Sequence, residues 1–423
     1  MRLLDDLRAH GQAPALVFPG SAPISYAELA RRVGEAAQRL GPGRKLVAVQ
    51  AANSEHAIIA YLAALQAGHA VALIPPCNSA RLEEFEADFQ PDYTFRMVDG
   101  RWRLVEGQAR GGEINPDLAV LLATSGSTGK ARFVRLSKRS IEANAQSIAN
   151  YLDLKSDDRA ALILPFHYAY GLSVLNSHLA VGASVFISAK GVLDAGFWED
   201  IQDAGCTNVS GVPYSYELME RTGFRQRDLP NLRFMTVAGG KMPSNLAETY
   251  RRHLARRHAR FFLMYGQTEA TARIAYVPPD CLAGNIDCIG VPIPGGELRL
   301  LDEDGQPIES FGVAGELAYR GPNVMMGYAT ERADLAKGAE LDELRTGDLA
   351  ERRPNGFYRI VGRLKRMSKI GGLRINHEAI EHALASRGMD AAVTGDDRRL
   401  VAVVASPRKL EAARRVMIEV SGL

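Results

Sequence analysis

Residues 117–136 decide the fold, and they read DLAVLLATSGSTGKARFVRL. Two apolar runs with strand character flank a short loop rich in glycine and hydroxyl groups. Gly126 and Gly129 let backbone N–H groups converge on one point, and the hydroxyl side chains add further donors. The hydroxyls belong to Thr124, Ser125, Ser127 and Thr128. Such a loop is typical of a site that holds a polyphosphate.

The same loop differs from a Walker A box, the phosphate loop of many kinases and ATPases. A Walker A box has a Gly five positions before its Gly-Lys pair and a Ser or Thr after it. Here those positions are Thr124 and Ala131. A P-loop kinase or ATPase is therefore disfavoured, and the loop taken alone is equally compatible with a plain Gly/Ser hairpin turn.

Helix and strand patterns alternate on both sides of this loop. Ser25–Glu28 predicts a capped helix to about Leu40. A strand at 45–50, a helix at 54–67 and a strand at 70–74 follow. Beyond the loop, the sequence predicts strands at 159–164, 183–188, 208–211, 234–238 and 260–265, and helices at 173–180, 198–204 and 244–258. This alternation indicates an α/β fold with parallel strands in two large layers.

From Gly290 the pattern changes to strands punctuated by Gly and Pro, which predicts a smaller β-rich lobe. Its strands are expected at 297–301, 315–320 and 357–361. The tail predicts a compact α+β module, with strands at 368–370, 373–375, near 391–393 and 400–405, and helices at 377–386 and from Lys409. We expect a multi-lobed core of residues 1–363 and a small, truncated C-terminal domain of residues 364–423.

Composition narrows the class of protein. Lys and Arg number 51 against 49 Asp and Glu, which argues against a surface built to bind nucleic acid or an anionic membrane. No signal peptide or membrane anchor is visible, and the four cysteines form no C-x-x-C pair. We expect a cytoplasmic protein with reduced thiols.

With these residues in view, the sequence resembles the acyl-adenylate-forming superfamily of acyl-CoA synthetases, aryl-acid ligases and adenylation domains. The superfamily's phosphate loop runs T-S-G-S/T-T-G-x-P-K, and Thr124–Gly129 match it, with Lys130 next. Two positions depart from the pattern. The family's Pro is Ala131 and its Lys is Arg132, which keeps the charge but not the shape of a lysine at a phosphate.

Two further motifs resemble the family's adenine-binding segments. They are Ala238-Gly239-Gly240 and Tyr265-Gly266-Gln267-Thr268-Glu269. The resemblance implies that Tyr265 stacks on adenine, Thr268 meets the α-phosphate and Glu269 holds Mg²⁺. A flat ring, a short donor and a hard oxygen ligand suit these three roles.

Later motifs match the family in the same order. Thr346-Gly347-Asp348 implies that Asp348 accepts the ribose hydroxyls, and Gly362-Arg363 resembles the hinge before the C-terminal domain. Arg363 is expected at the nucleotide and in catalysis. Rotation about Lys365 would bring Gly371-Gly372 beside the tunnel through which a pantetheine thiol enters.

Pro165–Gly171 resembles the family segment whose His or aromatic residue gates the acid-binding tunnel. His167 is therefore a candidate catalytic residue, with a packed neutral histidine as an equal explanation. No carboxylate occurs between Pro165 and Ala189, where amino-acid-activating members place an Asp for the α-ammonium group. The resemblance thus favours a fatty, aryl or similar acid without an α-amino group.

The resemblance implies an AMP-forming ligase that uses ATP and Mg²⁺ to activate a small carboxylic acid as acyl-AMP. The acyl group would then pass to CoA or to a phosphopantetheine carrier protein. The rival interpretation is a family member that has lost ligase activity and binds nucleotide, acyl-adenylate or a partner. The basic stretch Arg251–Arg260 is interpreted as a solvated helix face, with contact to CoA or an acidic carrier protein as the alternative.

Family members continue with a P-x-x-x-x-G-K segment whose Lys reaches the acid and the α-phosphate. Lys409–Leu423 contains no such motif, and Lys130 and Lys369 are the candidate replacements. From this we expect the 423-residue chain to bind ATP, to form acyl-AMP slowly and to use supplied acyl-AMP comparatively well.

Overall fold

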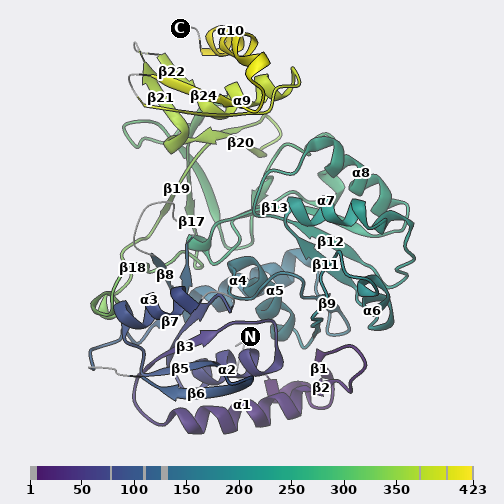
Figure 1. Ribbon diagram of the computed structural model, residues 1–423, viewed down its shortest axis with the longest axis vertical. Coiled ribbons are helices and arrows are strands. Elements are labelled where there is room, and N and C mark those ends of the chain that lie inside the picture. The colour runs from purple at the N-terminus through teal and green to yellow at the C-terminus, as the bar shows by residue number, and fades with distance from the viewer. Residues whose placement is uncertain are drawn as a thin grey trace. The chain divides into compact units, whose positions relative to one another are not determined.

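The computed structural model describes residues 7–76, 79–107, 111–124, 132–370, 373–396 and 399–421. Contacts divide the chain into two units, Met1–Glu297 with Arg320–Leu344, and Leu298–Tyr319 with Arg345–Leu423. The first unit carries two large sheets (Figure 1). The domain boundary expected after Arg363 falls inside the second unit and stays a prediction.

One sheet of the first unit has the strand order β18-β8-β7-β4-β3-β5-β6. The strands are β3 (Leu46–Gln50), β4 (Ala70–Ile74), β5 (Tyr93–Val98), β6 (Arg101–Glu106), β7 (Leu118–Ala123), β8 (Phe133–Ser137) and β18 (Gly327–Ala329). β5, β3, β4 and β7 run parallel, whereas β7 and β8 form an antiparallel hairpin. The loop predicted to bind phosphate therefore connects the two strands of this hairpin.

Helices α1 (Tyr26–Leu40), α2 (Glu55–Gln66) and α3 (Ser79–Phe89) belong to the same half of the chain. The backbone N–H of Glu28 donates to Ser25 Oγ at 3.2 Å, which confirms the predicted helix cap. α1 packs on α2, and α2 packs on β3 and β4. The apolar faces of α1 and α2 form one buried cluster with the strands, whereas Leu82, Phe85 and Phe89 of α3 belong to a second cluster.

The second sheet has the strand order β15-β14-β13-β12-β11-β9-β10-β1-β2. The strands are β1 (Pro14–Val17), β2 (Ile24–Ser25), β9 (Arg159–Ala161), β10 (Ser184–Phe186), β11 (Asn208–Gly211), β12 (Phe234–Val237), β13 (Arg260–Tyr265), β14 (Ala275–Tyr276) and β15 (Val291–Pro292). The six strands from β1 to β13 in this order are mutually parallel. Helices α6 (Phe197–Asp203), α7 (Pro213–Arg221) and α8 (Ser244–Ala255) lie in the connections.

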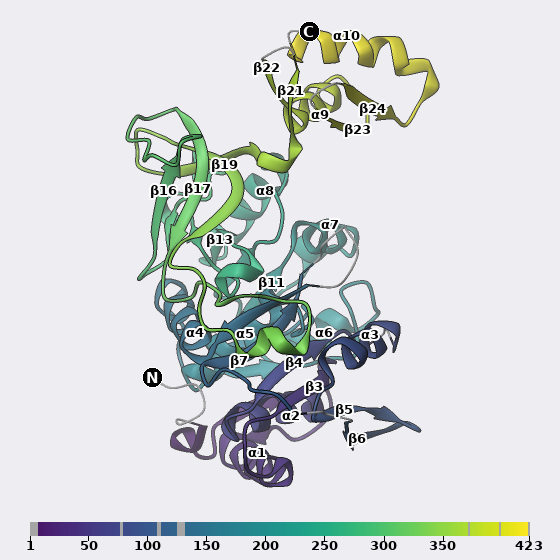
Figure 2. The ribbon, with the colours of Figure 1, turned by 90° about the vertical axis from the view of Figure 1, so that its left-hand side faces the viewer.

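Two helices join the sheets. α4 (Lys138–Leu152) packs against α5 (Ala169–Ala180), and the two helices lie side by side in both ribbon views (Figures 1 and 2). α4 contacts β7 and β8, and α5 contacts β9 and β10. Every residue of α5 is buried, as expected for a helix with apolar neighbours on all sides.

The second unit begins with the sheet β16-β17-β19-β20. Its strands are β16 (Glu297–Leu301), β17 (Ala314–Arg320), β19 (Leu344–Arg352) and β20 (Tyr358–Arg363). The tail adds the hairpins β21 (Met367–Ile370) with β22 (Leu373–Asn376) and β23 (Ala391–Gly395) with β24 (Leu400–Val404), and the helices α9 (His377–Ala385) and α10 (Leu410–Ser421). A separate buried cluster around Ile380 and Leu384 holds this tail together. The predicted α/β class, with a β-rich lobe and a small α+β C-terminal part, is confirmed.

Some predicted boundaries differ from the structure for identifiable reasons. The strand expected at 159–164 ends at Ala161, because Asn53 Nδ2 takes over the carbonyls of Leu162 and Leu164 at 3.0 and 3.1 Å. The helix expected to reach His258 ends at Ala255, and His258 adopts a left-handed φ of 57°. α3, α4, α7 and the β5–β6 hairpin were not among the predicted elements.

Candidate active site

The carboxyl ends of three parallel strands form the candidate site in the first unit. Gly211 of β11 is in register with Val237 of β12, and Val237 is in register with Leu263 of β13. The segments that leave these strands therefore meet at one edge of the sheet. This edge is where open parallel α/β sheets bind their ligands. The predicted motifs Gly239-Gly240 and Tyr265–Glu269 both leave the sheet here.

Gly239 can only be glycine without rearrangement of its neighbours. Its φ is +83°, and a Cβ there would lie 2.8 Å from Tyr168 Oη and 3.2 Å from Val212 Cγ1. Tyr168, at the N-terminus of α5, is thus placed against the Gly239-Gly240 segment, with 39% of its surface exposed. Sequence reasoning selected its neighbour His167 instead. The adjacent aromatic residues at 166, 168 and 170 were the available signal.

His167 is half-buried, and its Nδ1 lies 3.2 Å from the Ala51 carbonyl oxygen. Burial lowers the pKa of the imidazole, with the Ala51 hydrogen bond acting in the opposite direction. The ring is therefore neutral near pH 7, and Nδ1–H donates to the carbonyl. These contacts are those of a packed histidine. Its predicted catalytic role stays a prediction.

The segment Tyr265–Glu269 is a tight turn that closes on itself. The Ala272 N–H donates to the Gln267 carbonyl at 3.2 Å, and Gln267 Nε2 donates to Tyr265 Oη at 3.3 Å. A Cβ on Gly266 would overlap the Ala272 carbonyl oxygen at 1.9 Å. Thr268 and Glu269 begin a single turn of 3-10 helix and remain partly exposed. Their side chains are thus accessible at the strand ends.

Glu269 belongs to a chain of contacts that includes one end of the predicted phosphate loop. Tyr328 Oη donates to Glu269 Oε1 at 2.8 Å, and the Arg132 guanidinium lies 3.7 Å from the centroid of the Tyr328 ring. Burial and the Glu269 carboxylate together raise the pKa of Tyr328 to about 12, so its hydroxyl remains a donor. Tyr328 is on β18, which pairs with β8 directly after the loop.

Thr124 closes the other end of the loop. Its backbone N–H and its Oγ1 both donate to the Arg132 carbonyl, at 3.0 and 3.2 Å. The predicted binding residues Ser125, Gly126, Ser127, Thr128, Gly129 and Lys130 lie outside the described residues. The flanking residues Thr124 and Arg132 thus place the loop ends beside Tyr328 and Glu269.

The remaining predicted residues are in the second unit. Arg363 Nε lies 2.9 Å from Asp348 Oδ1, and the two residues are in register between β20 and β19. The Asp348 side chain is 4% exposed, against 63% for Arg363. Thr346 Oγ1 accepts the Asp348 N–H at 3.1 Å and donates to the Leu317 carbonyl at 2.7 Å. The motif thus holds the Asp348 backbone in a defined turn.

The basic stretch that begins on α8 and continues past its end is in part a solvated face. Arg251 and Arg252 both pair with Glu248, and Arg257 Nη1 donates to the Arg227 carbonyl at 2.6 Å. The buried face of α8 consists of Ala247, Tyr250 and Leu254. These pairings account for three of its arginines without a ligand.

A parallel sheet with glycine-rich and acidic strand-end loops defines a nucleotide-binding α/β protein. A family profile described as AMP-binding enzyme matches residues 4–329, and the chain belongs to this family. Feruloyl-CoA synthase of an Amycolatopsis species is 30% identical over 95% of this chain and 85% of its own length. The predicted acyl-adenylate-forming superfamily is therefore confirmed.

Two other proteins show similar likenesses. Indoleacetate–CoA ligase of Aromatoleum aromaticum is 31% identical to this chain. The matched region covers 64% of this chain and 53% of that ligase. The structure of ATP-bound MatB from Rhodopseudomonas palustris superposes with a TM-score of 0.78 at 24% identity, covering 95% of this chain and 88% of its own. In the described ranges, no helix is long and apolar enough to cross a membrane, and no group of three or more His, Cys, Asp or Glu could hold a metal ion.

Proposed function

We propose that this protein is an AMP-forming acid–thiol ligase. A carboxylate oxygen of the acid attacks the α-phosphorus of ATP, the bond to the β-phosphate breaks, and acyl-AMP and pyrophosphate result. A thiol then attacks the acyl carbon, and AMP leaves as the thioester forms. Membership of the AMP-binding enzyme family and the likeness to acid–CoA ligases support this reaction.

The observation that carries the proposal is the contact chain from Arg132 through Tyr328 to Glu269. It brings a cation at the end of the phosphate loop beside a carboxylate at the strand ends. Catalysis of reactions at phosphate consists largely of positioning and charge neutralisation, and a cation near the phosphate loop together with a carboxylate able to hold Mg²⁺ suits that task.

Each predicted residue has a role in this proposal. Tyr265 and Gly239-Gly240 would hold adenine, Thr268 would meet the α-phosphate, and the loop from Thr124 would hold the leaving pyrophosphate. Asp348 would accept the ribose hydroxyls, with Arg363 orienting its carboxylate. Tyr168, whose hydroxyl lies against the Gly239 position, is a second candidate beside His167 for lining the acid site.

Mg²⁺ fits the residues present. A single carboxylate, Glu269, is what a magnesium site needs when phosphate oxygens and water complete the shell. Tyr328 donates to Oε1 of Glu269 and so orients the carboxylate. When bound, the ion would offset negative charge on the phosphates.

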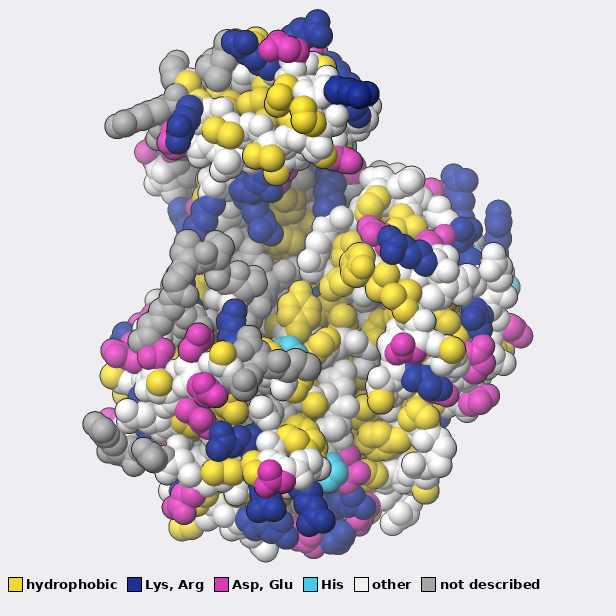
Figure 3. Space-filling view, viewed as in Figure 1, with side chains coloured by type: hydrophobic (Ala, Val, Ile, Leu, Met, Phe, Trp, Pro, Cys, Tyr) yellow, Lys and Arg dark blue, Asp and Glu magenta, His cyan; other side chains and the backbone are white. Residues whose placement is uncertain are grey.

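The proposed acid is argued from an apolar surface, and the proposed acceptor from the relatives. On the face shown in Figure 3, hydrophobic side chains gather over β9, β11, β12 and α7. An acid with an apolar body and no α-amino group suits this surface. CoA is the proposed acceptor because the relatives are acid–CoA ligases, and a carrier protein is the second candidate. We also propose a cytoplasmic location for this protein.

Product analysis tests the proposal. The purified chain is incubated with ATP, Mg²⁺, CoA and a panel of carboxylic acids, and products are identified by mass spectrometry. AMP together with acyl-CoA is expected. ADP would indicate a kinase, and the absence of turnover with preserved ATP binding would favour the binding-protein rival. Asp348→Ala should weaken ATP binding in calorimetry, and an unchanged affinity would remove the ribose assignment.

A further inference from the structure

Arg273 is an unusual arginine in this protein. It lies four residues after Glu269, and only 2% of its surface is exposed. Burying a guanidinium is unfavourable unless a carboxylate or a full set of hydrogen bonds compensates for the lost water. Arg273 has neither among the residues that the structure describes. Its Nη1 donates to the Ala272 carbonyl at 3.0 Å, and its Nε has no hydrogen-bond partner.

Arg135 shows how the same chain treats a structural buried arginine. It is 0% exposed, and all three nitrogens of its guanidinium are satisfied. Nε donates to the Tyr328 carbonyl at 3.1 Å and Nη1 to the Gly338 carbonyl at 3.2 Å, while Nη2 pairs with Glu340 Oε2 at 2.7 Å. Arg273 lacks this arrangement, so packing alone does not explain its charge.

The surroundings of Arg273 are aromatic and polar rather than acidic. Its guanidinium lies 3.9 Å from the centroid of the Tyr170 ring. Tyr170 Oη shares a hydrogen bond of 2.6 Å with Thr236 Oγ1, and Thr236 Oγ1 donates to Ser210 Oγ at 2.9 Å. The hydroxyl of buried Tyr151 also interacts with the guanidinium. These side chains come from α4, α5, β11 and β12.

This group lies directly behind the strand-end segments. A Cβ on Gly266, next to Tyr265, would be 2.9 Å from Arg273 Cα. Tyr170 is two residues after Tyr168, whose hydroxyl contacts the Gly239 position. Thr236 and Ser210 are each the third of the four residues in their strands, and the segments that form the edge of the sheet follow directly. The Arg273 backbone thus adjoins the turn that carries Tyr265, and its guanidinium packs on side chains from the elements behind that turn.

We propose that Arg273, backed by Tyr170, binds a second anionic group at the far end of the acid, so that the substrate is a dicarboxylic acid. The inference rests on the proposed ligase function and names its substrate class. The distal carboxylate would accept from Nε and supply the missing counter-charge. The segment 165–189 includes all of α5 and contains no Asp or Glu. It therefore has no carboxylate that would repel the distal carboxylate of the acid.

Matched acids test this directly. AMP release from ATP is measured for the full chain with hexanoate against adipate, decanoate against sebacate, and benzoate against terephthalate. The diacid of at least one pair should have a kcat/KM on the order of 100-fold above its monoacid, as expected for a desolvated charge pair. A preference for the monoacid in all pairs would overturn the inference. Activation of monoacids alone would leave the ligase proposal standing, whereas AMP release with no acid would contradict both.

Substitution provides the second arm. Arg273→Met should reduce kcat/KM for the preferred diacid on the order of 100-fold while that for its monoacid changes less than about threefold. Arg273→Lys should retain part of the preference for the diacid, because it keeps the positive charge. It replaces Arg273→Met in the test if the Met variant does not fold. Arg252→Met, on the exposed face of α8, is the matched control. An equal loss for both acids would show a structural role and contradict the inference.

Discussion

Tyr328 illustrates how single side chains determine the chemistry of the site. Its hydroxyl donates a hydrogen bond to Glu269, its ring packs against the Arg132 guanidinium, and its strand β18 pairs with β8. None of these contacts could be derived from local spacing, because Glu269 and Tyr328 are 59 residues apart. The sequence motif named Glu269, and the structure adds the group that orients it.

Tyr328→Phe should therefore impair catalysis without unfolding the protein. A hydrogen bond to a charged group contributes about 1.5–3 kcal/mol, so the rate of AMP release should fall roughly 10- to 100-fold. The Mg²⁺ concentration for half-maximal rate should rise, which a purely structural role would not produce. Tyr93→Phe on β5 is the control. A normal rate and an unchanged Mg²⁺ dependence would remove Tyr328 from the site.

Gly239→Ala tests the close approach of Tyr168. The left-handed φ costs an alanine about 1–2 kcal/mol, and the new Cβ would meet Tyr168 Oη at 2.8 Å. We expect a higher KM for the acid or for ATP, because binding is weaker. Tyr168→Phe in the same chain should recover the steric part but not the backbone part. If the double variant is as impaired as Gly239→Ala, the hydroxyl contact is not the cause.

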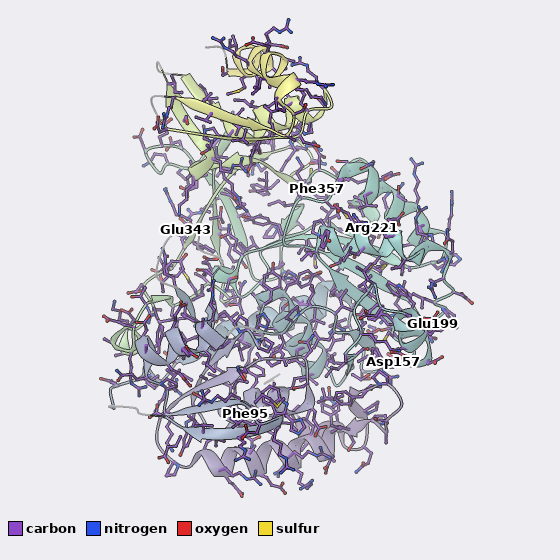
Figure 4. The ribbon with its side chains drawn as sticks, in the orientation of Figure 1. Phe95, Asp157, Glu199, Arg221, Glu343 and Phe357 are labelled. Atoms are coloured by element: carbon purple, nitrogen blue, oxygen red, sulfur yellow. The ribbon has the colours of Figure 1, made fainter. Side chains whose placement is uncertain are left out.

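At the scale of elements, the sequence predicted most of the strands and helices that position the site. β11 and β13 have the predicted bounds. For β13 the reason is the apolar run Phe261–Met264, which is typical of a buried strand. The β5–β6 hairpin was missed although Asp99-Gly100 is a strong two-residue turn signal. Its Phe95, labelled in Figure 4, stacks on Trp102 at 5.2 Å between ring centroids.

Other features were missed for different reasons. Leu82, Phe85 and Phe89 recur at helical spacing on α3, so a local signal was present. α7 has nine residues and depends on neighbours distant in the chain. The same holds within the site. Arg273 and Tyr170 are 103 residues apart by number and meet only because α5 packs beneath the strand ends. The sequence motifs predicted the residues of the strand-end loops. The residues that pack behind these loops could be identified only from the structure.

The junction of α5 with β11 predicts a pH dependence of stability. His178 accepts from Asn208 Nδ2 on Nε2 at 3.0 Å, and its Nδ1–H donates to the Val174 carbonyl at 2.8 Å. This pairing requires a neutral ring, and burial lowers the pKa of His178. Burial is also the first cause of a lowered pKa at His69, His167, His253 and His377.

The sign follows from proton binding. Below the ordinary histidine pKa of about 6.5, the unfolded chain binds protons that the folded chain does not. Stability is thus fully present above about pH 6.5 and falls as the pH drops below it, by about 1.4 kcal/mol per pKa unit of lowering for each histidine. The free energy of unfolding in urea should show this between pH 7 and 5. His178→Gln should flatten the slope, the exposed His382→Gln should not, and a slope unaffected by His178→Gln would contradict the assignment.

At the scale of the whole molecule, the chain has two units with separate interiors. The large cluster of the first unit runs through both of its sheets, while the C-terminal module has its own cluster around Ile380 and Leu384. Both tryptophans, Trp102 and Trp198, belong to the first unit. Tryptophan fluorescence therefore reports on one unit, and far-ultraviolet circular dichroism reports on both.

This distribution allows the independence of the two interiors to be measured. Leu384 is fully buried, and Leu384→Ala should cost about 2–5 kcal/mol through lost contacts and a cavity. Because this core is separate, the variant should lose part of the circular dichroism signal at lower urea while the fluorescence transition stays at its wild-type midpoint. Leu62→Ala, in the core of the first unit, should do the reverse and shift the fluorescence midpoint. If Leu384→Ala moves both transitions together, the two units unfold as one cooperative block, and the independence of their interiors would be refuted.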